Sequence, residues 1–143
     1  MIEIVNIDNE NLINNLQIIF SEIYKQKDEL KNEFKYNPYT KIYIYKDEDK
    51  VLGLIHINDI YDRYEINNIY VLEEYRNRGI ASKLLEEVIR IGNDNNIANI
   101  TLEVRNNNFN EINLYKKHGF LEKSIRKGYY NGIDGILMEK EMM

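Results

Sequence analysis

The chain has 143 residues, a length typical of one domain, and 43% of them are hydrophobic and 30% charged. The 19 basic and 24 acidic side chains give a net charge of -5, so we expect neither nucleic acid nor a membrane as partner. Cysteine is absent, which excludes disulfides, iron–sulfur clusters and cysteine nucleophiles, and with 2 histidines we expect no metal site. No apolar run reaches about 18 residues and the start lacks a signal-peptide pattern, so we expect a single cytoplasmic domain over residues 1–143.

The first half of the sequence predicts one helix and four β-strands. Asp8 stands where a helix N-cap belongs, and apolar residues then recur at helical spacing from Leu12 to Ile23. The polar turn at 47–50 joins two β-rich runs into a hairpin, and a third run extends it into an antiparallel meander. The predicted strands are residues 2–7, 41–45, 51–57 and 64–72.

The second half predicts helices and strands in alternation. An apolar helical stripe at 82–92 precedes an alternating run at 100–104, which indicates a β-α-β crossover. A second helix begins at Asn108, paired with Glu111 as in a capping box, and ends at Gly119. Two last strands follow at 123–130 and 133–141. We therefore predict an α+β fold whose mixed central sheet of about seven strands is mostly antiparallel, with one parallel crossover, and is flanked by helices.

The stretch from Tyr75 to Ser82, between a strand and a helix, is the most informative part of the sequence. Such a junction exposes unpaired backbone N–H groups at the positive end of a helix, which suits a phosphate or pyrophosphate. Gly79 and Ala81 leave the backbone open to close approach, while Arg76 and Arg78 add positive charge. A plain turn with solvated arginines is the alternative, because short glycine motifs are common.

Arg76-x-x-Gly79-x-Ala81 resembles the acetyl-coenzyme A (acetyl-CoA) pyrophosphate loop of the GNAT N-acetyltransferase superfamily. Residues 66–71 resemble the strand before that loop, and 108–120 resemble the family's Asn-x(5)-Leu-Tyr-x(3)-Gly-Phe segment. The resemblance is close over about residues 50–143 and holds only in pattern before them. It implies the GNAT fold and an enzyme that transfers an acetyl group from acetyl-CoA to a primary amine.

Within the superfamily, the chain is most similar to bacterial ribosomal-protein-alanine N-acetyltransferases and their protein N-terminal relatives. The matching residues are 102–105, Arg126-x-x-Tyr129-Tyr130 and Asp134-Gly135. Those relatives carry a Pro-Trp-Ser segment on the acceptor side, where this chain has Ser21-Glu22-Ile23-Tyr24 and no tryptophan. The resemblance implies a protein N-terminal α-amine as acceptor. The alternatives are a small amine, such as a polyamine, an amino acid or an antibiotic, and a coenzyme-A-binding module without turnover.

The resemblance also implies which residues bind coenzyme A. The strand residues expected to pair with its pantetheine arm are Ile69, Tyr70 and Val71. Those expected around the pyrophosphate are Arg76, Asn77, Arg78, Gly79, Ile80, Ala81 and Ser82. Asn108 matches an asparagine that touches coenzyme A, although a helix N-cap explains the same residue.

Two residues are assigned the chemistry by resemblance: Glu103 as general base and Tyr115 as proton donor to the departing thiolate. An acceptor ammonium must lose a proton before it attacks the thioester, which a carboxylate can accept. The alternatives are a Glu103 paired with Arg105 or another cation, and a Tyr115 that packs in the core.

The expected mechanism is direct transfer without a covalent intermediate, because no cysteine and no Ser-His pairing of nucleophilic type is present. We assign no catalytic role to His56, expected on a strand face, or to His118, expected on the surface in a last helical turn. The expected partners are acetyl-CoA and a protein N-terminus or other primary amine, for a monomer or weak dimer.

Overall fold

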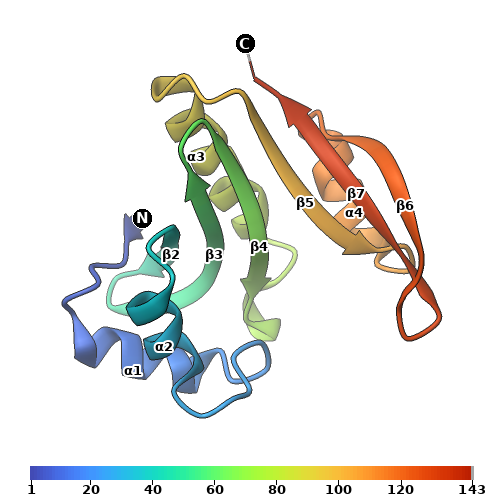
Figure 1. The fold of residues 1–143 in the computed structure, drawn as a ribbon. Coiled ribbons are helices and arrows are strands. Elements are labelled where there is room, and N and C mark those ends of the chain that lie inside the picture. Colours follow the sequence, from blue (N-terminus) through green and yellow to red (C-terminus); the bar gives the residue numbers. More distant parts are fainter. Residues whose placement is uncertain (143) are drawn as a thin grey trace. The chain divides into compact units, whose positions relative to one another are not determined.

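A computed structural model describes residues 1–142. Its elements, coloured along the chain in Figure 1, are β1 (Ile2–Ile4), α1 (Glu10–Ile19), α2 (Glu29–Tyr36), β2 (Thr40–Asp47), β3 (Lys50–Ile60), β4 (Arg63–Val71), the 3₁₀ turn η1 (Glu73–Tyr75), α3 (Ile80–Asp94), β5 (Asn99–Arg105), α4 (Phe109–Lys117), β6 (Leu121–Tyr130) and β7 (Ile133–Glu141). Within the described part, no helix combines the length and the apolar character needed to span a membrane.

The strands form a seven-stranded mixed sheet in the order β1-β2-β3-β4-β5-β7-β6. The neighbours β4 and β5 are parallel, and α3 is the crossover that two parallel strands require. The pairs β1–β2, β5–β7 and β6–β7 are antiparallel. This arrangement confirms the predicted α+β class, the seven strands and the single parallel crossover.

Contacts divide the chain into two compact units, so the single domain stays a prediction. The first unit comprises residues 1–57 and 68–84, and in it α1 and α2 pack on each other and on the first strands. Its buried cluster consists of Val5, Ile13, Leu16, Phe20, Tyr24, Leu30, Phe34, Ile42, Ile44, Val51 and Leu54.

The region between α1 and β2 differs from the sequence prediction. The N-cap of α1 is Asn9, whose side chain accepts a hydrogen bond from Leu12 N at 3.1 Å, and not Asp8. The helix ends at Ile19, and α2 follows as a second helix that we did not predict. With 8 residues and only Leu30 and Phe34 buried, α2 carries too short an apolar pattern to stand out.

The second unit comprises residues 58–67 and 85–143, of which 143 lies outside the described residues. Figure 1 shows β5, β7 and β6 running side by side, with β6 at the exposed edge. The predicted caps of α4 are present: Asn108 accepts from Glu111 N, and Gly119 has the positive φ of +91° that ends a helix. Ile100, Leu102 and Val104 are buried, as their alternation predicts.

Candidate functional site

The loop before α3 presents backbone amides beside open space. Asn77 and Gly79 both have positive φ, at 63° and 78°. The first backbone bond of α3 runs from Lys83 N to Gly79 O at 3.0 Å, so the N–H groups that precede it are those of Ile80, Ala81 and Ser82. A Cβ at Gly79 would meet no atom of the described residues within 4 Å. The loop is therefore open enough, and its dipole positive enough, for a phosphate group.

Gly53 on β3 makes this junction compact, a role that the sequence did not indicate. A Cβ at Gly53 would lie 3.0 Å from Tyr70 O and 3.3 Å from a methyl group of Ile80. The absence of a side chain therefore lets β3 approach both the end of β4 and the first residue of α3.

The two loop arginines contact the protein itself. Arg76 Nε donates to Val71 O at 2.8 Å, and its guanidinium lies over the Tyr70 ring at 5.1 Å. Arg78 lies over the Tyr75 ring at 5.3 Å. Arg76 thus holds the end of β4, in addition to carrying charge near the loop.

Glu22, which the sequence analysis did not single out as a site residue, contacts the predicted pantetheine strand. The Tyr70 hydroxyl donates a hydrogen bond to the Glu22 carboxylate, and this bond, with burial and the negative charge, raises the pKa of Tyr70. Glu22 is exposed and lies between α1 and α2. No local pattern predicts a contact between residues 48 positions apart.

The parallel register of β4 and β5 runs from the Arg63–Asn99 pair to the Ile66–Leu102 pair. The predicted pantetheine residues, Ile69, Tyr70 and Val71, come after the last of these pairs and form the end of β4. A strand end that continues past its paired segment is suited to pairing with the amides of an extended ligand.

Glu103 on β5 has two carboxylate oxygens in different environments. Oε2 lies 3.5 Å from Arg126 Nε, and the side chain is 21% exposed. Oε1 is buried and has no hydrogen-bond partner among the described residues. A Cβ at Gly135 would lie 3.0 Å from this oxygen, so the glycine on β7 leaves the space next to it. The cation beside Glu103 is therefore Arg126.

Two tyrosines and two arginines form a cluster that reaches Glu103 through Arg126 and Tyr130. The rings of Tyr129 and Tyr130 meet edge to face at 5.0 Å. Arg105 lies over Tyr130 at 5.0 Å and Arg126 over Tyr129 at 4.7 Å. Burial, followed by the charge of Glu103, raises the pKa of Tyr130. These residues form one aromatic and cationic cluster in the second unit.

Tyr115 and Asn108 both have the structural roles that we considered as alternatives. Tyr115 is 3% exposed, and its ring lies 5.6 Å from that of Phe120. Burial strongly raises the pKa of Tyr115, which keeps its hydroxyl protonated. Asn108 caps α4, and its side-chain amide also donates to the Glu111 carboxylate.

His118, expected on the surface, is only partly exposed, while His56 lies on strand β3, as expected. His118 Nδ1 lies 2.9 Å from Leu114 O, and its side chain is 10% exposed. His56 is 4% exposed. Among residues 1–142, no group of three or more histidine and carboxylate side chains is placed to hold a metal ion.

Residues 7–120 match the model of the acetyltransferase (GNAT) family. This chain belongs to that family. A Bacillus subtilis protein, whose name assigns it provisionally to the ribosomal protein bS18-alanine N-acetyltransferases, is 31% identical over 114 residues, which are 78% of this chain and 76% of that protein. An N-alpha-acetyltransferase of Saccharolobus solfataricus is 46% identical over 77 residues, which are 52% of this chain and 46%, about half, of that protein. The expected similarity to bacterial ribosomal-protein-alanine N-acetyltransferases is confirmed, and this GNAT chain is an N-acetyltransferase.

Solved structures of GNAT proteins share the fold. The ribosomal-protein-S18-alanine N-acetyltransferase of Escherichia coli superposes with a TM-score of 0.83 at 24% identity, over 100% of this chain and 96% of that one. A GNAT acetyltransferase of Elizabethkingia anophelis, solved with acetyl-CoA bound, gives a TM-score of 0.79 at 22% identity, over 99% and 97%.

Proposed function

We propose that this GNAT enzyme transfers the acetyl group of acetyl-CoA directly to the N-terminal α-amine of a protein, such as a ribosomal protein, with Glu103 as base. The observation that carries the proposal is Oε1 of Glu103, which is buried beside Gly135 and has no hydrogen-bond partner within residues 1–142. A buried polar atom without a partner costs free energy, and a proton-accepting role explains why it is kept. The names of the two relatives described above support the choice of acceptor.

On the donor side, the amides at the start of α3 would receive the pyrophosphate of acetyl-CoA. The observations that support this role are the open space at Gly79 and the position of the N–H groups of residues 80–82, which precede the first backbone bond of α3, donated by Lys83. Pantetheine would pair with the end of β4, at residues Ile69, Tyr70 and Val71. Arg76 would hold that strand end, since its Nε already donates to Val71 O.

In the proposed reaction, Glu103 Oε1 takes one proton from the acceptor ammonium. The neutral nitrogen then attacks the thioester carbonyl, and backbone N–H groups of the β4 end would stabilise the negative charge that develops on oxygen. Collapse of this intermediate leaves the new N–C bond in place and breaks the C–S bond. The leaving thiolate gains a proton from the Tyr115 hydroxyl, and the second proton of the nitrogen passes to the Tyr115 oxygen. Tyr115 therefore ends the reaction protonated, as its raised pKa requires.

One assay distinguishes the proposed function from its two alternatives, a small-amine acetyltransferase and a coenzyme-A-binding module without turnover. The chain is incubated with acetyl-CoA and, separately, with peptides that begin with Ala or Ser, with spermidine, with free amino acids and with an aminoglycoside. Free thiol release reports turnover, and mass spectrometry locates the acetyl group. We expect acetylated peptide N-termini. Preferred acetylation of a small amine would replace the proposal, and coenzyme A binding without thiol release would indicate a module that lacks turnover.

A further inference from the structure

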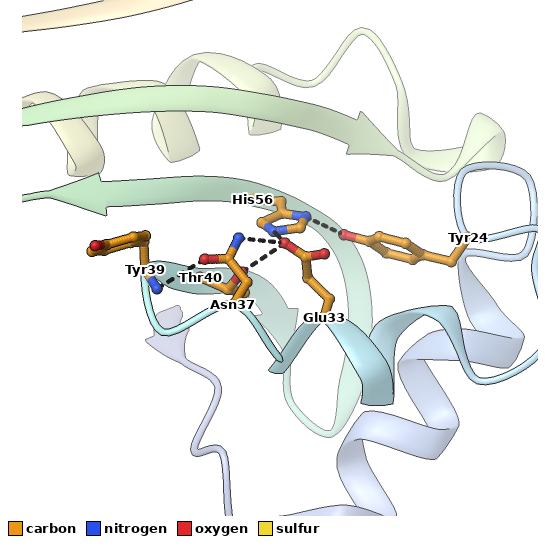
Figure 2. Close-up of polar contacts among 6 residues, drawn as sticks. All are labelled: Tyr24, Glu33, Asn37, Tyr39, Thr40 and His56. Atoms are coloured by element: carbon orange, nitrogen blue, oxygen red, sulfur yellow. Dashed lines mark hydrogen bonds and ion pairs between the residues drawn. The ribbon is translucent and has the colours of Figure 1, made fainter. Parts of the chain in front are cut away.

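A partly buried polar network in the first unit joins α2 and β3 to the segment 20–28, which connects α1 to α2 (Figure 2). His56 on β3 is at its centre. Its Nδ1 lies 3.0 Å from the Tyr24 hydroxyl oxygen, and its Nε2 lies 3.7 Å from Glu33 Oε1. His56 and Tyr24 are 4% and 3% exposed, and the chemistry proposed above uses neither.

The positions of the protons in this network follow from burial. Burial raises the pKa of Tyr24, so its hydroxyl keeps its proton and can donate to Nδ1. Burial also lowers the pKa of His56, although the carboxylates of Glu33 and Glu29 act in the opposite direction. A neutral ring that accepts at Nδ1 carries its own proton on Nε2, which faces Glu33.

Glu33 is held from the other side as well. Its Oε1 accepts hydrogen bonds from Thr40 Oγ1 and Asn37 Nδ2, each at 2.8 Å. Figure 2 shows His56 between this group and Tyr24. The 3.7 Å contact from His56 Nε2 is longer than a hydrogen bond, so Tyr24 is the close partner of the ring.

The same segment is fixed at its backbone by α1. Gln17 Nε2 donates to Tyr24 O at 2.6 Å and to Gln26 O at 3.2 Å, while Gln17 Oε1 accepts from Leu30 N at 2.8 Å. Tyr24 adds a side-chain attachment to β3 through His56. Two residues before Tyr24, Glu22 presents its exposed carboxylate to the Tyr70 hydroxyl.

We propose that His56 is a positioning residue, which through Tyr24 fixes segment 20–28 and so holds the Glu22 carboxylate at Tyr70 for an incoming ammonium group. The inference rests on the proposed function, because it assigns segment 20–28 to the acceptor. An exposed carboxylate that is held in one place attracts a cationic amine. The charge-assisted hydrogen bond between them is stronger when the carboxylate is already in the required position. We expect acetyl-CoA binding not to depend on this attachment, because neither His56 nor Tyr24 is among the residues proposed to bind it.

The test compares two variants, each of which lacks one tyrosine hydroxyl. Tyr24→Phe loses the bond to His56, and Tyr64→Phe loses a bond from Asn95 Nδ2 at another buried tyrosine, in the second unit. We expect Tyr24→Phe to raise the peptide KM by about 5-fold or more and to keep the acetyl-CoA Kd within about 2-fold. Tyr64→Phe should leave both constants within about 2-fold. An unchanged peptide KM in Tyr24→Phe, or an equal rise in both variants, would overturn the inference.

Two histidine variants test the same attachment from the other side. Asn can accept from Tyr24 with its side-chain carbonyl, whereas Leu cannot, so His56→Asn should restore most of the peptide affinity that His56→Leu loses. In the wild type, ¹⁵N spectra should show a neutral ring with its proton on Nε2. Equal losses in both variants, or a proton on Nδ1, would contradict the role given to His56.

Hydrogen exchange separates this inference from the proposed function. If the wild type acetylates no amine, the proposed function fails, but the attachment of segment 20–28 can still be measured. Amides in 20–28 should then exchange faster in Tyr24→Phe than in the wild type, and at the wild-type rate in Tyr64→Phe. Unchanged exchange in Tyr24→Phe would show that His56 does not hold the segment.

Discussion

Glu103 Oε2 lies 3.5 Å from Arg126 Nε, while Oε1 of the same carboxylate is buried without a hydrogen-bond partner among the described residues. One oxygen is therefore engaged by a cation and the other is available for a proton. Because Arg126 is 57% exposed, solvent screens the ion pair, and its contribution to stability is small. The two functions of the carboxylate can thus be separated by mutation.

Glu103→Gln should reduce kcat/KM by a factor on the order of 10² near neutral pH, because the amide cannot accept a proton. The loss should shrink at high pH, where the acceptor amine is already neutral and needs no base. Steady-state kinetics from about pH 6.5 to about pH 9.5 measure this. A variant whose profile parallels that of the wild type would mean that Glu103 is structural.

Arg126→Gln is the matched control for that experiment, since it removes the ion pair and leaves the carboxylate. We expect a change in kcat/KM of less than about 10-fold and a change in the free energy of unfolding below about 1 kcal/mol. If Glu103 served only to pair with Arg126, the two single variants and the double variant would lose the same activity. The double-mutant cycle decides between these results.

Gly79→Glu should abolish measurable acetyl-CoA binding while the chain stays folded. The added carboxylate occupies the open space at the start of α3 and repels phosphate, and the positive φ of 78° adds strain of about 1 kcal/mol. Gly132→Glu is the control, because Gly132 also has a positive φ, 92°, and a Cβ there would meet no atom of the described residues within 4 Å. Calorimetry with acetyl-CoA should give wild-type affinity for the control. If Gly79→Glu also bound acetyl-CoA with the wild-type affinity, the loop would be excluded as the donor site.

The parts of the fold that the sequence predicted are those with a local signal. The caps of α4 require only that Asn108 precede Glu111 by three residues and that Gly119 follow the last turn. The alternation from Ile100 to Val104 identifies β5, because each apolar residue falls on the same face. Such patterns depend on neighbours within one element.

The features that the sequence did not predict depend on distant contacts. The pairing of Glu22 with Tyr70, and of His56 with Tyr24, arises when α1, α2 and the sheet pack together, and no spacing along the chain encodes it. Likewise, Arg105 is close to Glu103 in sequence, but the edge strand β6 supplies the actual partner, Arg126. The order of strands in a sheet decides such pairs.

The free energy of unfolding should fall below about pH 6.5, and part of this loss should come from His56. The ordinary pKa of a histidine, 6.5, applies to the unfolded chain, and burial lowers the pKa of His56 below it in the folded chain. As the pH falls, the unfolded chain therefore binds more protons at His56 than the folded chain does. The contribution of neutral His56 to the free energy of unfolding is complete above pH 6.5. It is lost as the pH falls toward the folded-state pKa, by at most about 1.4 kcal/mol per pH unit. Urea unfolding of wild type and His56→Asn at about pH 7.5 and about pH 5.5 measures it. The difference between the two proteins should shrink at the lower pH, and a constant difference would contradict a neutral, buried His56.

Tyr130→Ala should raise the peptide KM several-fold without weakening acetyl-CoA binding, if Tyr129 and Tyr130 form an aromatic wall for the entering chain end. The two rings meet at 5.0 Å and each is also covered by an arginine, so the pair is held in place. Tyr130→Phe keeps the ring and should behave as the wild type. Loss of activity in Tyr130→Phe as well would assign the effect to the hydroxyl near Glu103. An unchanged peptide KM in Tyr130→Ala would show that the two rings form no such wall.

Acceptor selectivity is the final prediction, and it follows from proton affinity. An α-amine, with a pKa of about 7.7–8.0, is partly neutral near pH 7.5, whereas a lysine amine, with a pKa of about 10.4, is almost fully charged. A single carboxylate base such as Glu103 therefore favours the α-amine. A peptide that begins with Ala or Ser and contains one internal Lys should be acetylated mainly at its N-terminus, as tandem mass spectrometry can locate. Because both amines belong to one molecule, binding of the peptide as a whole cannot explain a preference. Acetylation mainly on Lys, or of spermidine in preference to every peptide, would reject the protein N-terminus as acceptor and favour a small amine.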